Sequence, residues 1–182
     1  MNISSSIKLA VKSFQHRDLQ GLAAALRPAT SGEVAETMNA LLTAVFSLFV
    51  KSRNYQWHIC GSQFRNSHRL LEEHGDQLYS MLQPIVLYLR TLGKTVFGPL
   101  GHLPTRPVLV DDDADHKGAW SILLELRDDN RALLPMLRRA KVGCESRGDD
   151  ENARLIEEWL DDAKCRANEL GETCDCPEPS WP

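Results

Sequence analysis

Apolar positions recur at intervals of three and four residues in several long segments of the chain, which is the spacing of amphipathic helices. The first segment begins after Thr30, and Thr30 with Glu33 forms a predicted capping box. Its apolar stripe continues toward Trp57, which we expect in the core, and Cys60-Gly61 ends the segment. The apolar positions of this helix are Val34, Met38, Leu41, Leu42, Val45, Leu48 and Phe49.

A second helical segment extends from about Gln63 to Leu92, with Gly93 as the predicted C-cap. Pro84 lies inside this segment and predicts a kink or a local bulge, because proline removes one backbone hydrogen bond. Residues 94–113 follow and are interrupted by Gly98-Pro99 and by further glycine and proline. They predict a long crossover that holds one short helical turn.

Two more helices follow the crossover. The third extends from about Asp115 to Arg147, is closed by Gly148 and is expected to bend at Pro135. The fourth opens with Asp149-Asp150-Glu151, whose charges suit a helix N-terminus, and ends near Leu170.

The pattern predicts an all-α fold, since no alternating strand pattern competes with the helices. Four helices with one long connection between the second and the third describe the bundle typical of ferritin-like folds. We divide the chain into an N-terminal basic arm (1–30), the bundle domain (31–170) and a C-terminal tail (171–182) that contains Cys-Asp-Cys.

Charge is distributed unevenly along the chain. The 182 residues contain 21 Lys+Arg and 25 Asp+Glu, which gives a net charge of −4. The chain as a whole therefore lacks the excess positive charge that is typical of nucleic-acid-binding proteins. The first 30 residues carry a net +3, which leaves −7 for the remainder. Any DNA contact is therefore expected in the arm, through Lys8, Lys12, Arg17 and Arg27. An alternative stays open, in which the arm packs on protein through Ile7, Leu9, Ala10, Val11 and Phe14.

The composition also predicts the cellular compartment of the protein. Uninterrupted apolar runs are far shorter than the roughly 20 residues of a membrane span, and no signal peptide is visible, so we expect a cytoplasmic protein without a membrane contact. Five scattered cysteines are expected to be reduced thiols. Cys174 and Cys176 are either a soft-metal or redox pair, or incidental thiols in a tail, and we favour the second interpretation.

Residues that bind metals concentrate between positions 54 and 76. Asn54-Tyr55-Gln56-Trp57-His58 is followed by His68 and then by Glu72-Glu73-His74. His68 and Glu72 are four residues apart, so they share one helix face and lie within reach of a common ion. His58 and His74 point in other directions, and we interpret them as polar surface or interface residues.

The segment from Asn54 to Glu73 has the pattern Asn-Tyr-x-Trp-His-x-x-Gly-x-x-Phe-x-x-x-His-x-x-Leu-Glu-Glu, which resembles the signature of the Dps mini-ferritins. The resemblance implies a four-helix subunit with a small helix in the crossover, and twelve subunits around a hollow that stores oxidised iron. It also implies protection of DNA. In that family the ferroxidase centre lies between two subunits.

The resemblance identifies five ligand positions, and this chain departs from the family at most of them. His68 is kept, and Glu72 keeps a carboxylate. Gln56, Gln83 and Leu87 stand where a histidine, an aspartate and a glutamate are expected. Because Gln and Leu are poor or impossible ligands for a hard cation, we predict weak or absent ferroxidase activity, with residual binding of one divalent ion.

The family's iron pores lie near the start of the last helix, which here carries Asp149, Asp150 and Glu151. Their alternative role is a plain helix cap. The first functional hypothesis is thus a Dps-like shell that sequesters iron and protects DNA. The second is a non-catalytic structural or DNA-compacting shell that can co-assemble with an active relative, and the third is a metal site relocated to His58, His74 or the terminal cysteines.

Overall fold

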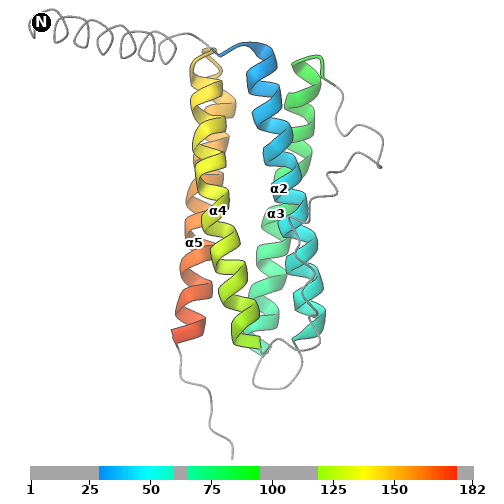
Figure 1. The fold of residues 1–182 in the computed structure, drawn as a ribbon, viewed down its shortest axis with the longest axis vertical. Helices are drawn as coiled ribbons and strands as arrows, with labels where there is room; N and C mark the ends of the chain where they lie inside the picture. Colours follow the sequence, from blue (N-terminus) through cyan, green and yellow to red (C-terminus); the bar gives the residue numbers. More distant parts are fainter. Residues whose placement is uncertain (1–28, 60–64, 95–118, 176–182) are drawn as a thin grey trace, which may run out of the picture.

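The computed structural model describes residues 29–59, 65–94 and 119–175, which form four long helices (Figure 1). These are α2 (Ser31–His58), α3 (Arg65–Thr91), α4 (Ala119–Glu145) and α5 (Asp150–Asp175). The described ranges contain no strand, so the predicted all-α bundle is confirmed. Residues 1–28 of the predicted arm, and the crossover beyond Lys94 with its expected short helix, lie outside the described residues.

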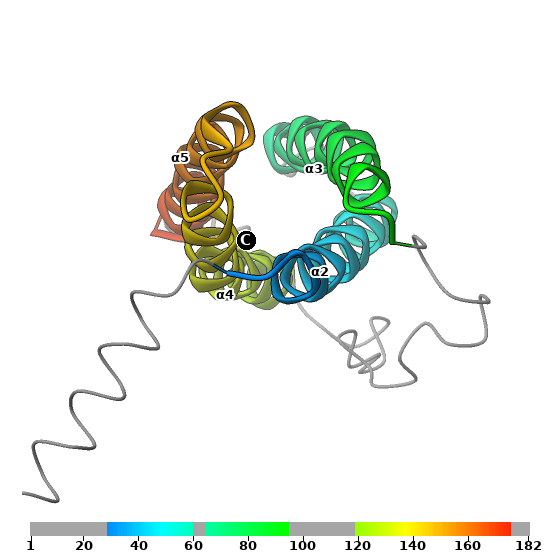
Figure 2. The same cartoon turned by 90° about the horizontal axis from the view of Figure 1, so that it is seen from above.

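The four helices surround one apolar core, in the order α3, α2, α4, α5 around the bundle axis (Figure 2). The most extensive contact is between α4 and α5, followed by that between α2 and α3, whereas α3 and α5 make few contacts. Every helix contributes a buried apolar stripe, as the periodicity predicts. The large, fully buried apolar side chains include Met38, Leu41, Leu42, Leu71, Leu78, Met81, Ile85, Leu89, Leu123, Leu126 and Leu137.

The predicted helix caps are present. The Glu33 N–H donates to Thr30 Oγ1 at 3.2 Å, and the Thr30 N–H donates to Glu33 Oε2 at 2.7 Å, which completes the capping box. Gly93 and Gly148 end α3 and α4 with φ of 70° and 71°, a left-handed conformation that favours glycine. The Lys94 N–H donates to Leu89 O at 3.2 Å, as in a Schellman ending.

One helix end differs from the prediction, whereas the prolines end no helix. The helical structure of α3 and α4 continues through Pro84 and Pro135. The last helix does not end near Leu170 but extends to Asp175, because Cys174 continues its buried stripe and packs against the core. The interpretation of Cys174 as an incidental thiol in a tail is therefore wrong, while Cys176 lies outside the described residues.

The average hydropathy of α2 contrasts with the shortness of its apolar runs. By length and composition alone, α2 is long and apolar enough to cross a membrane. Its apolar side chains include core residues such as Val34, Leu41 and Val45, which contribute to this apolar composition. One such helix is weak evidence for a membrane span.

Two cysteines of the bundle should differ sharply in reactivity. Cys144 is buried and its thiol lies 3.6 Å from Tyr88 Oη, and burial raises the pKa of the Cys144 thiol. Cys165 is exposed. Since the thiolate is the reactive form, we expect iodoacetamide to label Cys165 at pH 8 at least tenfold faster than Cys144. Peptide mass spectrometry of timed samples measures both rates, urea-unfolded protein is the control, and equal rates in the folded protein would contradict the prediction.

Candidate functional site

Four of the five family ligand positions lie on one exposed face of α3. His68, Glu72, Gln83 and Leu87 are all solvent-exposed, and their spacing of 4, 15 and 19 residues keeps them within about 100° of the helix circumference. Within the described ranges, no three His, Cys, Asp or Glu side chains lie close enough together to hold a metal ion. A single subunit therefore offers only His68 and Glu72 at these positions, and they are two ligands short of a tetrahedral site.

The fifth position, Gln56 on α2, is buried and is occupied with another interaction. Its Oε1 accepts a hydrogen bond from Arg53 Nη1 at 3.0 Å, and Arg53 also forms an ion pair with Asp76 on α3. A Cβ atom on Gly75 would lie 2.9 Å from Arg53 Nε, so the guanidinium group lies directly against the bare backbone of α3. A fixed cation beside Gln56 opposes the binding of a second cation there.

Large apolar side chains are exposed next to these positions. On α2 they are Phe46, Val50 and Trp57, and on α3 they are Tyr79 and Leu87; we call these five residues the α2/α3 face. The Phe49 and Tyr79 rings lie 5.5 Å apart between the two helices. Exposed apolar side chains on neighbouring helices are typical of surfaces that contact another protein.

Trp57 is 72% exposed, so its prediction as a core residue is wrong. The physical reason is its register on α2, because the preceding residue, Gln56, takes the buried position and the next residue is rotated by about 100°. Trp57 instead belongs to the stripe of Phe46, Val50 and Arg53, which recur at helical spacing.

The two remaining histidines of the motif have different environments. His58 is exposed, and its Nδ1 lies 2.8 Å from the Asn54 carbonyl oxygen. His74 is buried rather than on the surface, with Nε2 at 2.8 Å from Glu169 Oε2, and its burial lowers its pKa. A relocated metal site that uses these histidines has no support among the described residues.

A polar network that the sequence analysis did not predict lies inside the bundle. Arg166 of α5 is completely buried, and it donates from Nε to Asn130 Oδ1 at 2.8 Å and from Nη1 to Gln77 Oε1 at 3.0 Å. Burial lowers the pKa of Arg166 to about 10. With the bond from His74 to Glu169, the network joins α3 and α5 at two levels. The sequence does contain a signal for this network, because Arg166 lies at helical spacing from the apolar Ala163 and Leu170 and so falls on the buried stripe of α5.

The three acidic residues at the start of α5 are divided between two roles. Asp149 caps the helix, because its Oδ1 accepts from the Asn152 N–H at 3.2 Å and from Asn152 Nδ2 at 3.0 Å. Asp150 and Glu151 are exposed on the first turn. The capping role of the acidic group is thus confirmed for Asp149, and Asp150 and Glu151 present their charge to solvent.

Comparisons with known proteins agree with this geometry. The model of the ferritin-like domain family matches residues 35–176. A curated relative, an uncharacterized low temperature-induced protein of Nostoc sp., is 30% identical over 105 residues, which are 58% of this chain. The match spans 59% of the length of that relative. A homologue from Anabaena variabilis gives the same values.

Solved structures with the same fold include several Dps proteins. A dps-homologue from Halobacterium salinarum has a TM-score of 0.73 and 17% identity, and the match covers 83% of this chain and 84% of that one. Antigen TpF1 from Treponema pallidum has the same TM-score, 21% identity, and coverage of 82% and 97%. DpsC from Streptomyces coelicolor has a TM-score of 0.71 and 21% identity, with coverage of 81% and 87%.

Proposed function

The chain belongs to the ferritin-like family, and from this premise we propose that it is a subunit of a hollow, Dps-type shell of twelve copies. In this proposal the shell sequesters iron and protects DNA under oxidative stress, and its usual ferroxidase centre is degenerate. The α2/α3 face is the observation that supports assembly most directly, because it exposes Trp57, Tyr79 and Leu87 on one side of the subunit.

The degenerate centre follows from the residues at the family positions. Leu87 has no lone pair, and the neutral amides of Gln56 and Gln83 bind hard cations less well than imidazole or carboxylate. Oxidation raises the charge of the ion, so the missing carboxylates disfavour the ferric product as well. His68 and Glu72 remain to bind one divalent ion weakly, and both are exposed.

Native mass spectrometry and iron oxidation kinetics test the proposal together. We expect a dodecamer, retention of iron with the protein on gel filtration, and oxidation of Fe²⁺ by oxygen or peroxide within twofold of the rate in protein-free buffer. The variant Trp57→Asp should dissociate the shell, whereas the exposed Ser80→Asp on α3 is a control for helix substitution. A monomer, or oxidation tenfold above the buffer rate, would overturn the corresponding part of the proposal.

A second candidate function is a purely structural or DNA-compacting shell, alone or assembled with an active relative that supplies the missing ligands. The Arg53 guanidinium group favours this alternative, because it places a permanent cation beside Gln56. Retention of iron separates the two functions, since a structural shell would elute without iron and still shift DNA.

The proposed DNA contacts are Lys8, Lys12, Arg17 and Arg27, which lie outside the described residues. Twelve arms of net charge +3 would bind phosphate through counterion release, although the rest of the chain is acidic. A gel-shift assay of the chain without residues 1–30 tests this role at several salt concentrations. Undiminished, salt-sensitive binding would refute the arm as the DNA contact.

The double variant Asp149→Asn/Asp150→Asn is expected to slow the uptake of Co²⁺ into the shell severalfold. Removing two charges weakens the attraction of a cation to a pore at the start of α5. Asparagine caps helices as well as aspartate does, so the melting temperature should stay within about 3 °C of the natural value. Stopped-flow absorbance measures the rate of Co²⁺ uptake, and Asp161→Asn on the same helix is the matched control. An unchanged rate of uptake in the double variant would contradict a pore role for Asp149 and Asp150.

A further inference from the structure

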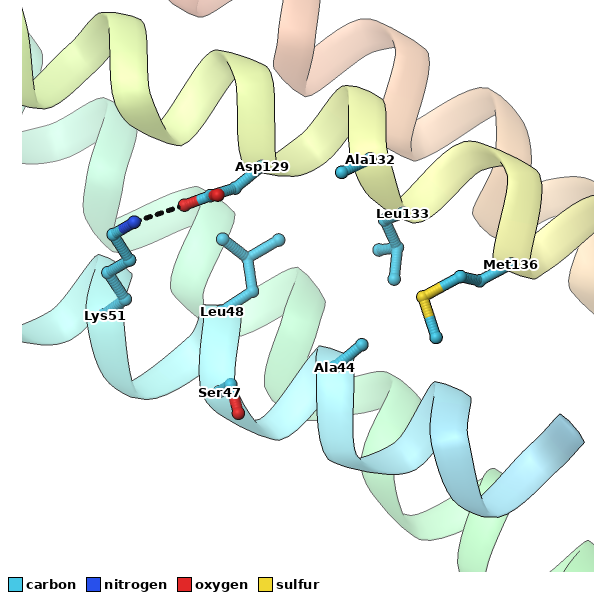
Figure 3. A pocket seen from close by; sticks show the side chains of 8 residues that line it. All are labelled: Ala44, Ser47, Leu48, Lys51, Asp129, Ala132, Leu133 and Met136. Carbon is cyan, nitrogen blue, oxygen red and sulfur yellow. Dashed lines mark hydrogen bonds and ion pairs between the residues drawn. The ribbon is translucent and has the colours of Figure 1, made fainter. Parts of the chain in front are cut away.

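A pocket lies between α2 and α4 (Figure 3). It is lined mainly by apolar side chains, among them Ala44, Leu48, Leu133 and Met136. A second hollow, nearer the start of α2, is lined by Ala40, Met136 and Arg139 together with Glu33, Glu36 and Thr37. Met136 lines both hollows, so they are adjacent, and we call the two together the α2/α4 groove.

The groove exists because small side chains face it from both helices. Ala40 and Ala44 are one turn apart on α2, and Ala132 lies one turn before Met136 on α4. Side chains of this size leave room between two helices that contact each other more deeply in the core. The groove is therefore an apolar surface that another segment can fill.

The first described residues of the chain are fixed at one end of this groove. The Ala29 N–H donates to Ser146 Oγ at 3.2 Å, and Arg147 Nη1 donates to Ser31 Oγ at 2.8 Å. Ser146 and Arg147 follow the C-terminal end of α4, so the chain enters α2 from the side of α4. The 28 residues that precede Ala29 thus begin beside the opening of the α2/α4 groove.

We infer that the α2/α4 groove is the docking site of this chain's own residues 7–14, with Ile7, Val11 and Phe14 against its apolar lining. These three residues are spaced by four and three positions. Phe14 and Ala44 are each fifteen residues from Ala29. Ala44 is about 22 Å along the helix from Ala29, a distance that fifteen residues span in helical or extended form.

The charge at the far end of the groove is complementary to the charge of residues 7–14. Lys51 Nζ lies 2.5 Å from both Glu125 and Asp129, and Figure 3 shows its bond to Asp129. Two carboxylates share one lysine, which leaves a net negative charge beside the apolar lining. Lys8 and Lys12 alternate with Ile7 and Val11 in the docking segment and complement that charge. The inference is independent of iron, and it is the alternative to the DNA role of Lys8 and Lys12, because a docked segment holds these two lysines on protein.

A photo-crosslinking experiment on the full chain tests the docking. Phe14 is replaced with p-benzoylphenylalanine, the assembled protein is irradiated, and the linked peptides are identified by mass spectrometry. We expect the dominant product to join position 14 to the peptide that contains Met136 or to the one that contains Ala44. Mixing ¹⁴N- and ¹⁵N-labelled chains before assembly distinguishes a link within one chain from a link between two.

Matched variants make the result decisive. Ala132→Glu places a charge in the groove at an exposed helical position, and it should lower the yield of this product at least fivefold. Ser80→Glu, an exposed change on α3, should leave the yield unchanged. Products that map outside the groove, a yield indifferent to Ala132→Glu, or links between differently labelled chains would each overturn docking by the chain's own segment. The last outcome would assign the groove to a second copy.

Discussion

Replacing Arg166 with alanine is expected to lower the free energy of unfolding by about 3–5 kcal/mol. Arg166 is fully buried, and its hydrogen bonds to Asn130 and Gln77 are lost in the variant. The buried Asn130 Oδ1 would then have no donor from Arg166, and a cavity would remain between α3 and α5. Urea unfolding followed by far-UV circular dichroism, at one fixed protein concentration, measures the change.

The exposed Arg131→Ala on α4 is the matched control, and it should change the free energy of unfolding by less than about 0.5 kcal/mol. A second variant, Arg166→Met/Asn130→Leu, removes Arg166 together with its buried partner Asn130 and fills part of the volume, while Gln77 is exposed and can bond to water. It should be more stable than Arg166→Ala, because no buried amide loses its donor. If Arg166→Ala matched Arg131→Ala within 1 kcal/mol, the network would not stabilise the bundle.

Restoring the family ligands is expected to raise the initial rate of Fe²⁺ oxidation at least tenfold, which corresponds to about 1.4 kcal/mol of barrier. The restoring variant is Gln56→His/Gln83→Asp/Leu87→Glu, and it returns one imidazole and two carboxylates to their positions. The gain should be larger when Arg53→Gln is added, because the guanidinium group beside residue 56 repels a bound cation. Stopped-flow absorbance with oxygen or peroxide measures the rates.

Two comparisons control this experiment. Arg53→Gln alone, without the restored ligands, should leave oxidation at the rate of the natural chain. Anaerobic Fe²⁺ titration by calorimetry separates binding from oxidation, and native mass spectrometry verifies that each variant assembles. An assembled variant with all four changes that neither binds nor oxidises Fe²⁺ would show that substitution of these positions is not what limits the natural chain.

Local sequence signals predicted several helix ends well, because the interactions that cap a helix join residues that are close in sequence. Thr30 and Glu33 are three residues apart and bond to each other, and Gly93 and Gly148 adopt the positive φ that glycine tolerates best. The end of α5 was predicted less well, because the packing of Cys174 depends on a core that includes Trp120 of another helix. The periodicity of apolar residues predicts that α5 is a helix, whereas the position of its C-terminal end depends on tertiary contacts.

The candidate site was predictable only as a set of positions. The resemblance to the Dps proteins predicts that Gln56, Gln83 and Leu87 replace ligands, but it gives no indication that Arg53 bonds to Gln56. Gly75 leaves space for that contact, because it has no side chain to meet the guanidinium group. Arg166 was missed for a similar reason, since its partners Asn130 and Gln77 are distant in sequence and meet it only in the folded bundle.

The sparse contact between α3 and α5 gives the subunit a direction of opening. Polar side chains join these helices at two levels, through His74 with Glu169 and Gln77 with Arg166. Elsewhere around the bundle, closely packed helices meet, above all α4 with α5 and α2 with α3. We expect transient opening to move the pair α2 and α3 away from the pair α4 and α5, while the contact between α2 and α4 stays in place. Amide exchange along α3 and α5 would then precede amide exchange at the contact between α2 and α4.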